Sequence, residues 1–262
     1  MSNSSLSSPG VASGIALITG GSRGLGKSAA IHLAKRGWDV VITYVERVDA
    51  ARDTVHAVEA LGRKAVALQL NTGETATFKA FVGAFSQTLR ETFGRAGFDA
   101  LVNNAGNSAN VPFLETTEQE FDALMNVHLK GVFFLTQALV PLLADGGRII
   151  NISSGLARFY SPGKATYATM KGGIEVFSRY LAKELGPRGI RVNALAPGAI
   201  ATDFSNGTVR DNPQVNAFVA SNTALGRVGQ AEDIGGAVAA LLSPEMGWIT
   251  GERIEASGGM FL

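Results

Sequence analysis

The sequence predicts an α/β fold of the Rossmann type, with one doubly wound parallel sheet of about seven strands and helices on both faces. The first observation is that short, nearly continuous apolar runs alternate with longer segments of helical periodicity. Such runs are typical of strands that are covered on both faces. The second is that no linker rich in proline or glycine interrupts the alternation. Repeated right-handed strand–helix crossovers build one parallel sheet, so we expect a single domain at residues 14–262.

The expected elements follow one another in regular order. We predict strands at 15–19, 39–44, 65–70, 99–104, 148–153, 191–196 and, more weakly, 253–256. Helical periodicity covers 27–36, 49–61, 74–93, 118–143, 167–185 and 231–242. Residues 1–13 are rich in serine and are expected to form a flexible tail before the domain.

Composition narrows the classes of function. Of 262 residues, 46% are apolar and 17% are charged, which is enough for a sizeable core, and the net charge of +1 gives no electrostatic reason to expect a nucleic-acid or membrane partner. The absence of cysteine excludes disulfides and thiolate metal sites. The scattered His32, His56 and His128 indicate structural roles rather than a metal site. Without a signal-peptide pattern or an apolar run of the ~18 residues that a membrane span needs, we expect a soluble, cytoplasmic protein.

The first strand runs into the segment TGGSRGLG, with glycines at Gly20, Gly24 and Gly26, and a helix follows at once. Such a loop lets backbone N–H groups approach a pyrophosphate, and the helix N-terminus adds a favourable dipole. Glycine loops are common in turns, but this position between the first strand and a helix specifically indicates dinucleotide binding.

The end of the second strand indicates which dinucleotide binds. NAD-binding folds place an acid there for the ribose 2′-OH, whereas here Tyr44 ends the strand and Glu46 is the nearest acid. Arg23 lies within the glycine loop and Arg47 follows Glu46. A guanidinium binds a phosphate through two parallel hydrogen bonds, so the pattern favours NADP(H) over NAD(H). The alternatives are that Glu46 binds the 2′-OH and that both arginines are solvated surface charges.

Four motifs occur in order along the chain: TGGSRGLG, NNAG at 103–106, a serine-ended strand near 153, and YATMK at 167–171. In this combination the chain resembles the short-chain dehydrogenase/reductase family from residue 15 to its C-terminus. The resemblance is greatest to 3-oxoacyl-carrier-protein reductases and similar ketone reductases. It implies an enzyme that transfers hydride between a nicotinamide and a carbonyl or secondary alcohol.

The resemblance implies a catalytic group of Asn126, Ser154, Tyr167 and Lys171. Ser154 lies thirteen residues before Tyr167, the spacing that the family uses, whereas Ser153 would point to the opposite face of a continuing strand. In the family the asparagine, matched here by Asn126, holds a water of the proton relay. The lysine also holds the nicotinamide ribose.

The resemblance also implies the residues that contact the cofactor, in addition to Tyr167 and Lys171. They lie in the glycine loop, at the ends of the second to fourth strands, and in the PGAIAT segment after the sixth. They are Gly20, Ser22, Arg23, Gly24, Leu25, Gly26, Tyr44, Arg47, Asn71, Thr72, Asn104, Ala105, Gly106, Pro197, Gly198, Ile200 and Thr202.

Tyr167 and Lys171 are four residues apart on a predicted helix, so their side chains share one face. A phenol titrates near ~10, too high for easy proton exchange at neutral pH. A neighbouring ammonium favours the phenolate, so we expect Lys171 to lower the pKa of Tyr167. The pair can then exchange a proton with a carbonyl oxygen while hydride moves at the cofactor.

The substrate is the least readable part of the sequence. Residues 203–225 form a polar, irregular stretch, which by resemblance is a mobile substrate lid. We expect an apolar substrate pocket that includes Leu156, Phe159, Tyr160 and Phe204. The segment before the fifth strand contains Asp145 and no basic residue until Arg148. This disfavours binding of an acidic carrier protein and favours a free ketone or alcohol as substrate. Arg188 could still help to bind a carrier.

Three other functions remain open. They are an NAD-dependent polyol, sugar or steroid dehydrogenase, a 3-oxoacyl-carrier-protein reductase, and a non-catalytic nucleotide sensor. The resemblance also implies a homotetramer in which the helices at 118–143 and 167–185 pack across subunits, with a C-terminal contact region.

Overall fold

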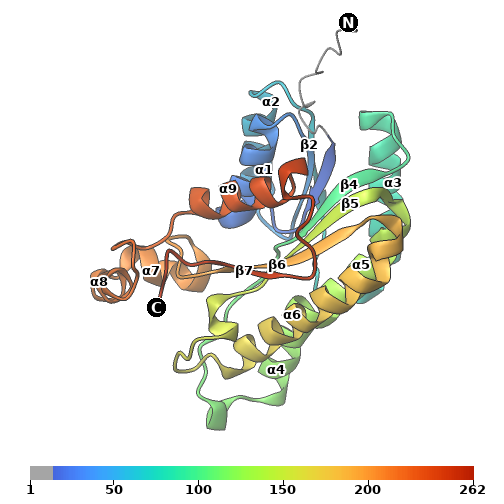
Figure 1. The fold of residues 1–262 in the computed structure, drawn as a ribbon. Helices are drawn as coiled ribbons and strands as arrows, with labels where there is room; N and C mark the ends of the chain where they lie inside the picture. The colour runs from blue at the N-terminus through green and yellow to red at the C-terminus, as the bar shows by residue number, and fades with distance from the viewer. Residues whose placement is uncertain (1–13) are drawn as a thin grey trace, which may run out of the picture.

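The computed structural model describes residues 14–262, so the tail expected at 1–13 lies outside the described residues. Its strands form one parallel sheet in the order β3-β2-β1-β4-β5-β6-β7 (Figure 1). The strands are β1 Ile15–Ile18, β2 Asp39–Tyr44, β3 Ala65–Gln69, β4 Phe98–Asn103, β5 Leu143–Ile152, β6 Arg191–Pro197 and β7 Arg253–Ala256. Every predicted strand is present. The largest difference is β5, which begins at Leu143 because this residue pairs with Phe98 before an irregularity in the register.

The sheet separates two hydrophobic cores. In β1, Ala16 and Ile18 face the core formed with α1, α2 and α9, whereas Ile15 and Leu17 face the core formed with α3, α5 and α6. Successive side chains of a strand point to opposite faces, so both faces need apolar residues and the run is continuously apolar. These helices are α1 Gly24–Lys35, α2 Val48–Glu59, α3 Phe78–Phe93, α5 Gly131–Leu139, α6 Ala165–Leu185 and α9 Ala231–Leu241.

The helix predicted at 118–143 is not continuous. It consists of α4 (Glu118–Met125), a π-helical turn (Asn126–Lys130), α5 and a short 3-10 turn. Gly131 allows the start of α5 to pack closely against Thr72, because a Cβ atom at this position would lie 2.0 Å from the carbonyl oxygen of Thr72. Inserted π turns often occur at functional sites, and this one lies beside the residues described below.

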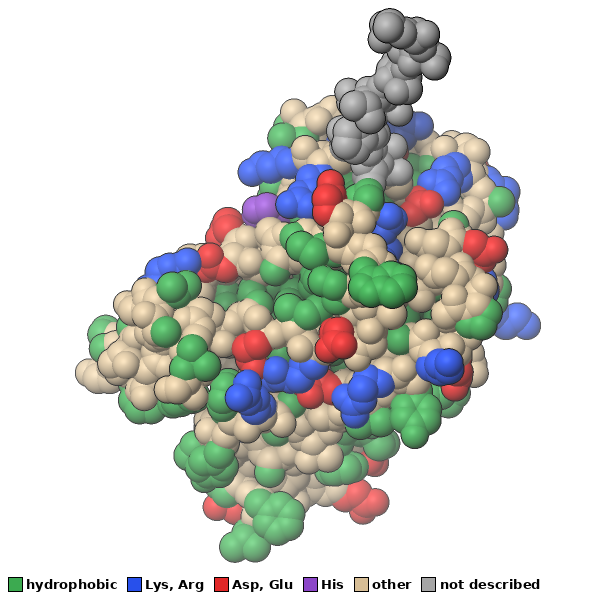
Figure 2. All heavy atoms as spheres, in the orientation of Figure 1, with side chains coloured by type: hydrophobic (Ala, Val, Ile, Leu, Met, Phe, Trp, Pro, Cys, Tyr) green, Lys and Arg blue, Asp and Glu red, His purple; other side chains and the backbone are tan. Residues whose placement is uncertain are grey.

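The stretch from Glu118 to Leu142 is long and apolar enough to cross a membrane by length and composition, and it is the one such stretch among residues 14–262. It is not an uninterrupted apolar run, because it contains Glu120, Asp122 and Lys130, and a helix of a protein core meets the same criterion. In the fold its inner face packs against the sheet, while Phe121, Phe133 and Phe134 are exposed on its outer face. Figure 2 shows apolar side chains exposed over the lower part of the molecule, where Figure 1 places α4.

The lid segment is more ordered than we predicted. Instead of an irregular stretch, it contains a 3-10 turn (Phe204–Gly207), α7 (Thr208–Asp211) and α8 (Pro213–Ser221). The side chain of Asn212 caps α8, accepting hydrogen bonds from the N–H groups of Gln214 and Val215, and Pro213 starts the helix. This Asn-Pro pair is a helix-start signal, and it was legible in the sequence.

Candidate active site

The glycine loop lies at the carboxyl end of β1, next to β4, where the order of the strands reverses. Crevices at such switch points bind ligands in doubly wound folds. The loop is fixed to the NNAG motif, because the Thr19 hydroxyl accepts hydrogen bonds from the N–H groups of Asn104 (2.9 Å) and Ala105 (3.0 Å). The Asn104 side chain donates in return to the carbonyls of Thr19 and Gly20. Asn104 and Ala105 therefore hold the loop in shape.

Asn103, the first residue of the NNAG motif, has a structural position. It is buried, and its side chain donates to Thr136 of α5 (2.9 Å) and to Asn151 of β5 (2.8 Å). Asn151 donates in turn to Ser178 of α6. This buried polar chain joins two helices to the centre of the sheet.

The start of α1 fits a pyrophosphate. A Cβ atom on Gly26 would lie 2.3 Å from the carbonyl oxygen of Gly20, so only glycine allows the loop to close this tightly. Arg23, at the N-cap position, makes no side-chain hydrogen bond to the first turn of α1. The first N–H groups of the helix therefore remain available for an anion, as dinucleotide binding requires.

The remaining predicted cofactor residues lie along the same edge of the sheet, although several are held by other contacts. Tyr44 ends β2, and Pro197 ends β6. Asn71 stabilises its own turn, since its side chain donates to Glu74 and accepts from the N–H of Gly73. Thr202 faces Gly24, and its hydroxyl accepts from the N–H of Phe204. Leu25 lies in the first turn of α1. The other predicted residues lie in loops that follow the strands; they are Ser22, Thr72, Gly106, Gly198 and Ile200.

The structure brings Ser154, Tyr167 and Lys171 together beneath the lid, and all three are buried. Lys171 Nζ lies 5.6 Å from the centre of the Tyr167 ring and donates a 2.7 Å hydrogen bond to the carbonyl of Ile152 at the end of β5. Ser154 Oγ accepts from the N–H of Leu156, whereas Ser153 donates to Glu175 on the other side. The two serines thus have different partners, and the catalytic role of Ser154 stays a prediction.

The electrostatics of the pair differ from our expectation. Burial raises the pKa of Tyr167 to about 12, and a hydrogen bond with Ser154 opposes the shift. Burial also lowers the pKa of Lys171 to about 7. The expected lowering of the Tyr167 pKa by Lys171 is therefore wrong for this structure, because loss of solvation disfavours the charged form of both groups.

This burial predicts a pH dependence of stability. An unfolded chain keeps Lys171 protonated up to its ordinary pKa of 10.5, whereas the folded chain releases the proton near pH 7. The unfolded state thus binds more protons between these values, and stability rises with pH across this window. Denaturant midpoints of the wild type relative to Lys171→Met should increase from pH 7 to pH 10. Parallel curves for the two proteins would contradict the burial of an ionisable Lys171.

The helix residue that packs against Tyr167 is His128, which we had assigned a structural role, rather than Asn126. The two rings meet edge to face with centres 5.1 Å apart. His128 Nε2 lies 2.8 Å from the Asn107 carbonyl and 3.0 Å from its side-chain oxygen, which favours a proton on Nε2. Nδ1 is then a buried acceptor without a partner among the described residues. Burial, with the charge of Lys171, lowers the pKa of His128 to about 3 and keeps the ring neutral.

A pattern in the sequence identifies His128 as a residue on the buried face of its helix. Leu124, His128, Gly131 and Leu135 recur at helical spacing, and all four are buried. Asn126 lies off this stripe. Its backbone carbonyl accepts from the N–H of Gly131, and no side-chain hydrogen bond of Asn126 occurs among residues 14–262. Its catalytic role stays a prediction.

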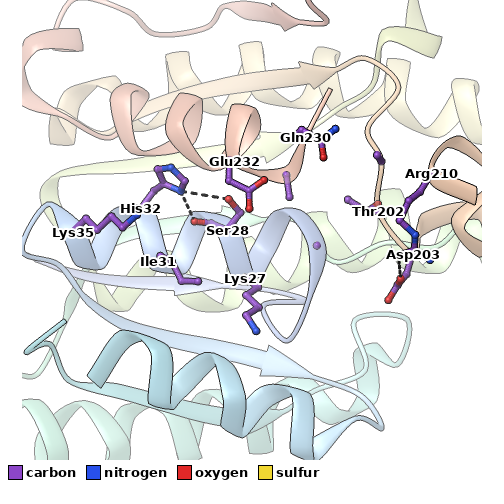
Figure 3. A pocket seen from close by; sticks show the side chains of 13 residues that line it. Lys27, Ser28, Ile31, His32, Lys35, Thr202, Asp203, Arg210, Gln230 and Glu232 are labelled. Carbon is purple, nitrogen blue, oxygen red and sulfur yellow. Dashed lines mark hydrogen bonds and ion pairs between the residues drawn. The ribbon is translucent and has the colours of Figure 1, made fainter. Parts of the chain in front are cut away.

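Two cavities flank this region. The larger, of ≈ 360 Å³, lies between α1, α9 and the start of the lid (Figure 3), and Tyr167 is not among its lining residues. The cavity beside Tyr167 measures only ≈ 10 Å³. Of the predicted pocket residues, Leu156 and Phe204 contact the Tyr167 region. Phe159 instead packs edge to face against Phe261, and Tyr160 is exposed.

A dinucleotide loop at the switch point of a parallel sheet, beside buried serine, tyrosine and lysine, is typical of dehydrogenases and reductases. A family model described as enoyl-(acyl carrier protein) reductase matches residues 20–261. The 3-oxoacyl-[acyl-carrier-protein] reductase FabG of Staphylococcus aureus is 35% identical over 250 residues, which cover 94% of this chain and 98% of that protein.

Solved structures agree with this assignment. The reductase LugOII, which catalyses keto-reduction at C1 during lugdunomycin biosynthesis, has a TM-score of 0.90 and 37% identity, covering 95% of this chain and 98% of that chain. The angucycline C-6 ketoreductase LanV, solved with bound NADP, has a TM-score of 0.89 and 35% identity over the same shares. The chain belongs to the short-chain dehydrogenase/reductase family and is an oxidoreductase.

Proposed function

We propose that the protein is an NADP(H)-dependent carbonyl reductase acting on a free ketone. The observation that carries the proposal is the burial of Ser154, Tyr167 and Lys171 as one group at the end of the sheet that bears the dinucleotide loop. The nicotinamide, when bound, supplies or accepts the hydride. The protein must then bind the carbonyl, exclude water and transfer one proton.

These tasks divide among the three side chains. The hydroxyls of Ser154 and Tyr167 bind the carbonyl oxygen, and Tyr167 gives its proton to that oxygen as negative charge develops. Burial raises the pKa of Tyr167 to about 12, so the phenol is protonated before reduction and holds the proton that it gives. The alkoxide that develops on the substrate is a stronger base than a phenolate and can take this proton. Lys171 restores the proton, and it would bind the nicotinamide ribose of a bound cofactor. His128 positions the Tyr167 ring, and Asn126 is the residue expected to hold the relay water.

NADP(H) is the preferred cofactor in this proposal. Arg23 and Arg47 approach the same oxygen of Asp203, at 3.2 and 3.9 Å, so both guanidiniums reach a single anion site. The solved structure of LanV contains NADP, which supports the same preference at the family level. NAD(H) remains the alternative, as for a polyol, sugar or steroid dehydrogenase.

A free ketone fits the surroundings of Tyr167 better than a carrier-bound thioester. Leu156 and Phe204 give the site an apolar wall. LugOII catalyses a keto-reduction in lugdunomycin biosynthesis, and LanV is an angucycline C-6 ketoreductase. Arg188, the one base considered for a carrier protein, already binds Asp145 and the carbonyls of Val140 and Leu143. The similarity to FabG keeps a 3-oxoacyl-carrier-protein substrate as the second candidate.

We also propose a cytoplasmic homotetramer. The outer faces of α5 and α6 expose Phe133, Phe134, Val176 and Tyr180, an apolar area that a helix–helix contact between subunits would cover. Light scattering of the purified protein measures the assembly directly.

The experiment that tests the proposed function follows cofactor oxidation with NADPH and NADH across a panel of ketones. The panel holds polycyclic aryl ketones, small aliphatic ketones and a 3-oxoacyl thioester. We expect NADPH and aryl ketones to give the highest kcat/KM. A preference for the thioester would favour the carrier-protein reductase, and a preference for NADH would favour the dehydrogenase alternative.

A further inference from the structure

Asp203, the first residue of the lid, joins three parts of the molecule. Its Oδ2 lies 3.2 Å from Nη1 of Arg23 in the glycine loop and 3.9 Å from Nη1 of Arg47 in the β2–α2 loop. Its Oδ1 accepts a 2.5 Å hydrogen bond from Arg210 of α7, the pair that Figure 3 shows side by side. Thus one carboxylate occupies the position where two guanidiniums converge.

The charges of this group do not balance. Arg210 has a second partner, because Asp211 binds it at 2.7 and 2.8 Å. Arg23 and Arg47 have no carboxylate partner other than Asp203 in the described part of the chain. Two cations therefore share one carboxylate, and an added anion would be attracted there. The ion pairs are about half exposed, so a phosphate that binds both guanidiniums can displace Asp203.

The next residue connects this group to the reacting phenol. Phe204 follows Asp203, and its ring lies 6.1 Å from the ring of Tyr167. Ser205 then donates to Ser108, which also binds Lys164 at the entrance to the site. The start of the lid therefore contacts both the reacting phenol and the loop after β4 that bears Ser108.

We infer that Asp203 is a latch that competes with the 2′-phosphate of NADP(H) for Arg23 and Arg47. When the phosphate binds these arginines, Asp203 is released, and the Phe204 ring moves away from Tyr167 with the lid. NAD(H) has no 2′-phosphate and leaves the latch closed. Asp203 thereby couples the choice of cofactor to the opening of the substrate site. This inference rests on the proposed preference for NADP(H).

The test compares 2′,5′-ADP with 5′-AMP, which differ by the 2′-phosphate, in calorimetric titrations of the wild type, Asp203→Asn and Asp211→Asn. Asp203→Asn removes the competitor, so its affinity for 2′,5′-ADP should rise about fivefold, the factor that corresponds to one exposed ion pair. Its affinity for 5′-AMP should not change. Asp211→Asn removes the same charge from the next partner of Arg210 and controls for general electrostatics, so both affinities should stay within about twofold of wild type.

Hydrogen exchange of residues 203–211 provides a second readout that does not depend on catalysis. In the wild type, 2′,5′-ADP should accelerate exchange of this segment while 5′-AMP does not, and in Asp203→Asn exchange should be fast without ligand. Three results would each overturn the latch. They are unchanged or weaker binding of 2′,5′-ADP by Asp203→Asn, an equal effect of Asp211→Asn on this binding, and hydrogen exchange of the lid that does not respond to 2′,5′-ADP. If the wild type does not prefer 2′,5′-ADP over 5′-AMP, the proposed cofactor preference itself fails.

Discussion

Tyr167→Phe is expected to lower kcat for ketone reduction by about 10²- to 10⁴-fold, the range that loss of a positioned general acid produces. The substitution removes one hydroxyl from a buried ring and leaves the contacts of that ring with His128 and Phe204. Dinucleotide affinity and the unfolding midpoint should therefore change little. Steady-state kinetics with a substrate from the ketone panel, together with a cofactor titration, measure both effects.

The same assay distinguishes the two helix residues near this phenol. His128→Leu keeps the volume of a buried side chain but removes Nδ1 and the hydrogen bond to Asn107, so we expect a lower kcat and a changed pH profile. Asn126→Ala should have a smaller effect, because its side chain has no hydrogen bond to lose within the described region. Near-normal turnover of Tyr167→Phe would contradict the proposed mechanism. A larger loss in Asn126→Ala than in His128→Leu would support the relay role expected of Asn126.

Gly26→Ala is expected to abolish measurable dinucleotide binding. The added methyl group would lie 2.3 Å from the carbonyl oxygen of Gly20 and 2.7 Å from Nδ2 of Asn104, and a backbone atom cannot move away as a flexible side chain can. The glycine loop must then open, and the start of α1 is displaced from the anion it would bind. Calorimetric titration with NADPH measures the loss.

Gly83→Ala is the matched control for this substitution. Gly83 also lies within a helix, α3, but a Cβ atom there meets no atom within 4 Å. This variant should keep full affinity and gain about 0.5–1 kcal/mol in the free energy of unfolding, because alanine favours the helix. Equal NADPH affinity of Gly26→Ala and Gly83→Ala would show that the tight loop is unnecessary for binding.

Local patterns in the sequence were sufficient to predict much of the fold. Residues buried on both faces of a sheet must be apolar in succession, which is why each strand was legible. The boundaries were less predictable. The early start of β5 at Leu143 depends on pairing with Phe98, and Gly131, directly after the π turn at 126–130, packs closely against Thr72. Both are contacts between segments far apart in the chain.

The sequence by itself determined the glycine loop, the helical spacing of Tyr167 and Lys171, and the order of strands and helices, because each follows from the backbone or side-chain chemistry of neighbouring residues. The tertiary structure decided which helix residue faces the phenol, since helix rotation placed His128 rather than Asn126 against Tyr167. The tertiary structure also decided the pKa values of Tyr167 and Lys171, because both shifts come from burial. It decided the partner of Arg23 and Arg47 as well, since their ion pairs with Asp203 form only once distant segments have packed together.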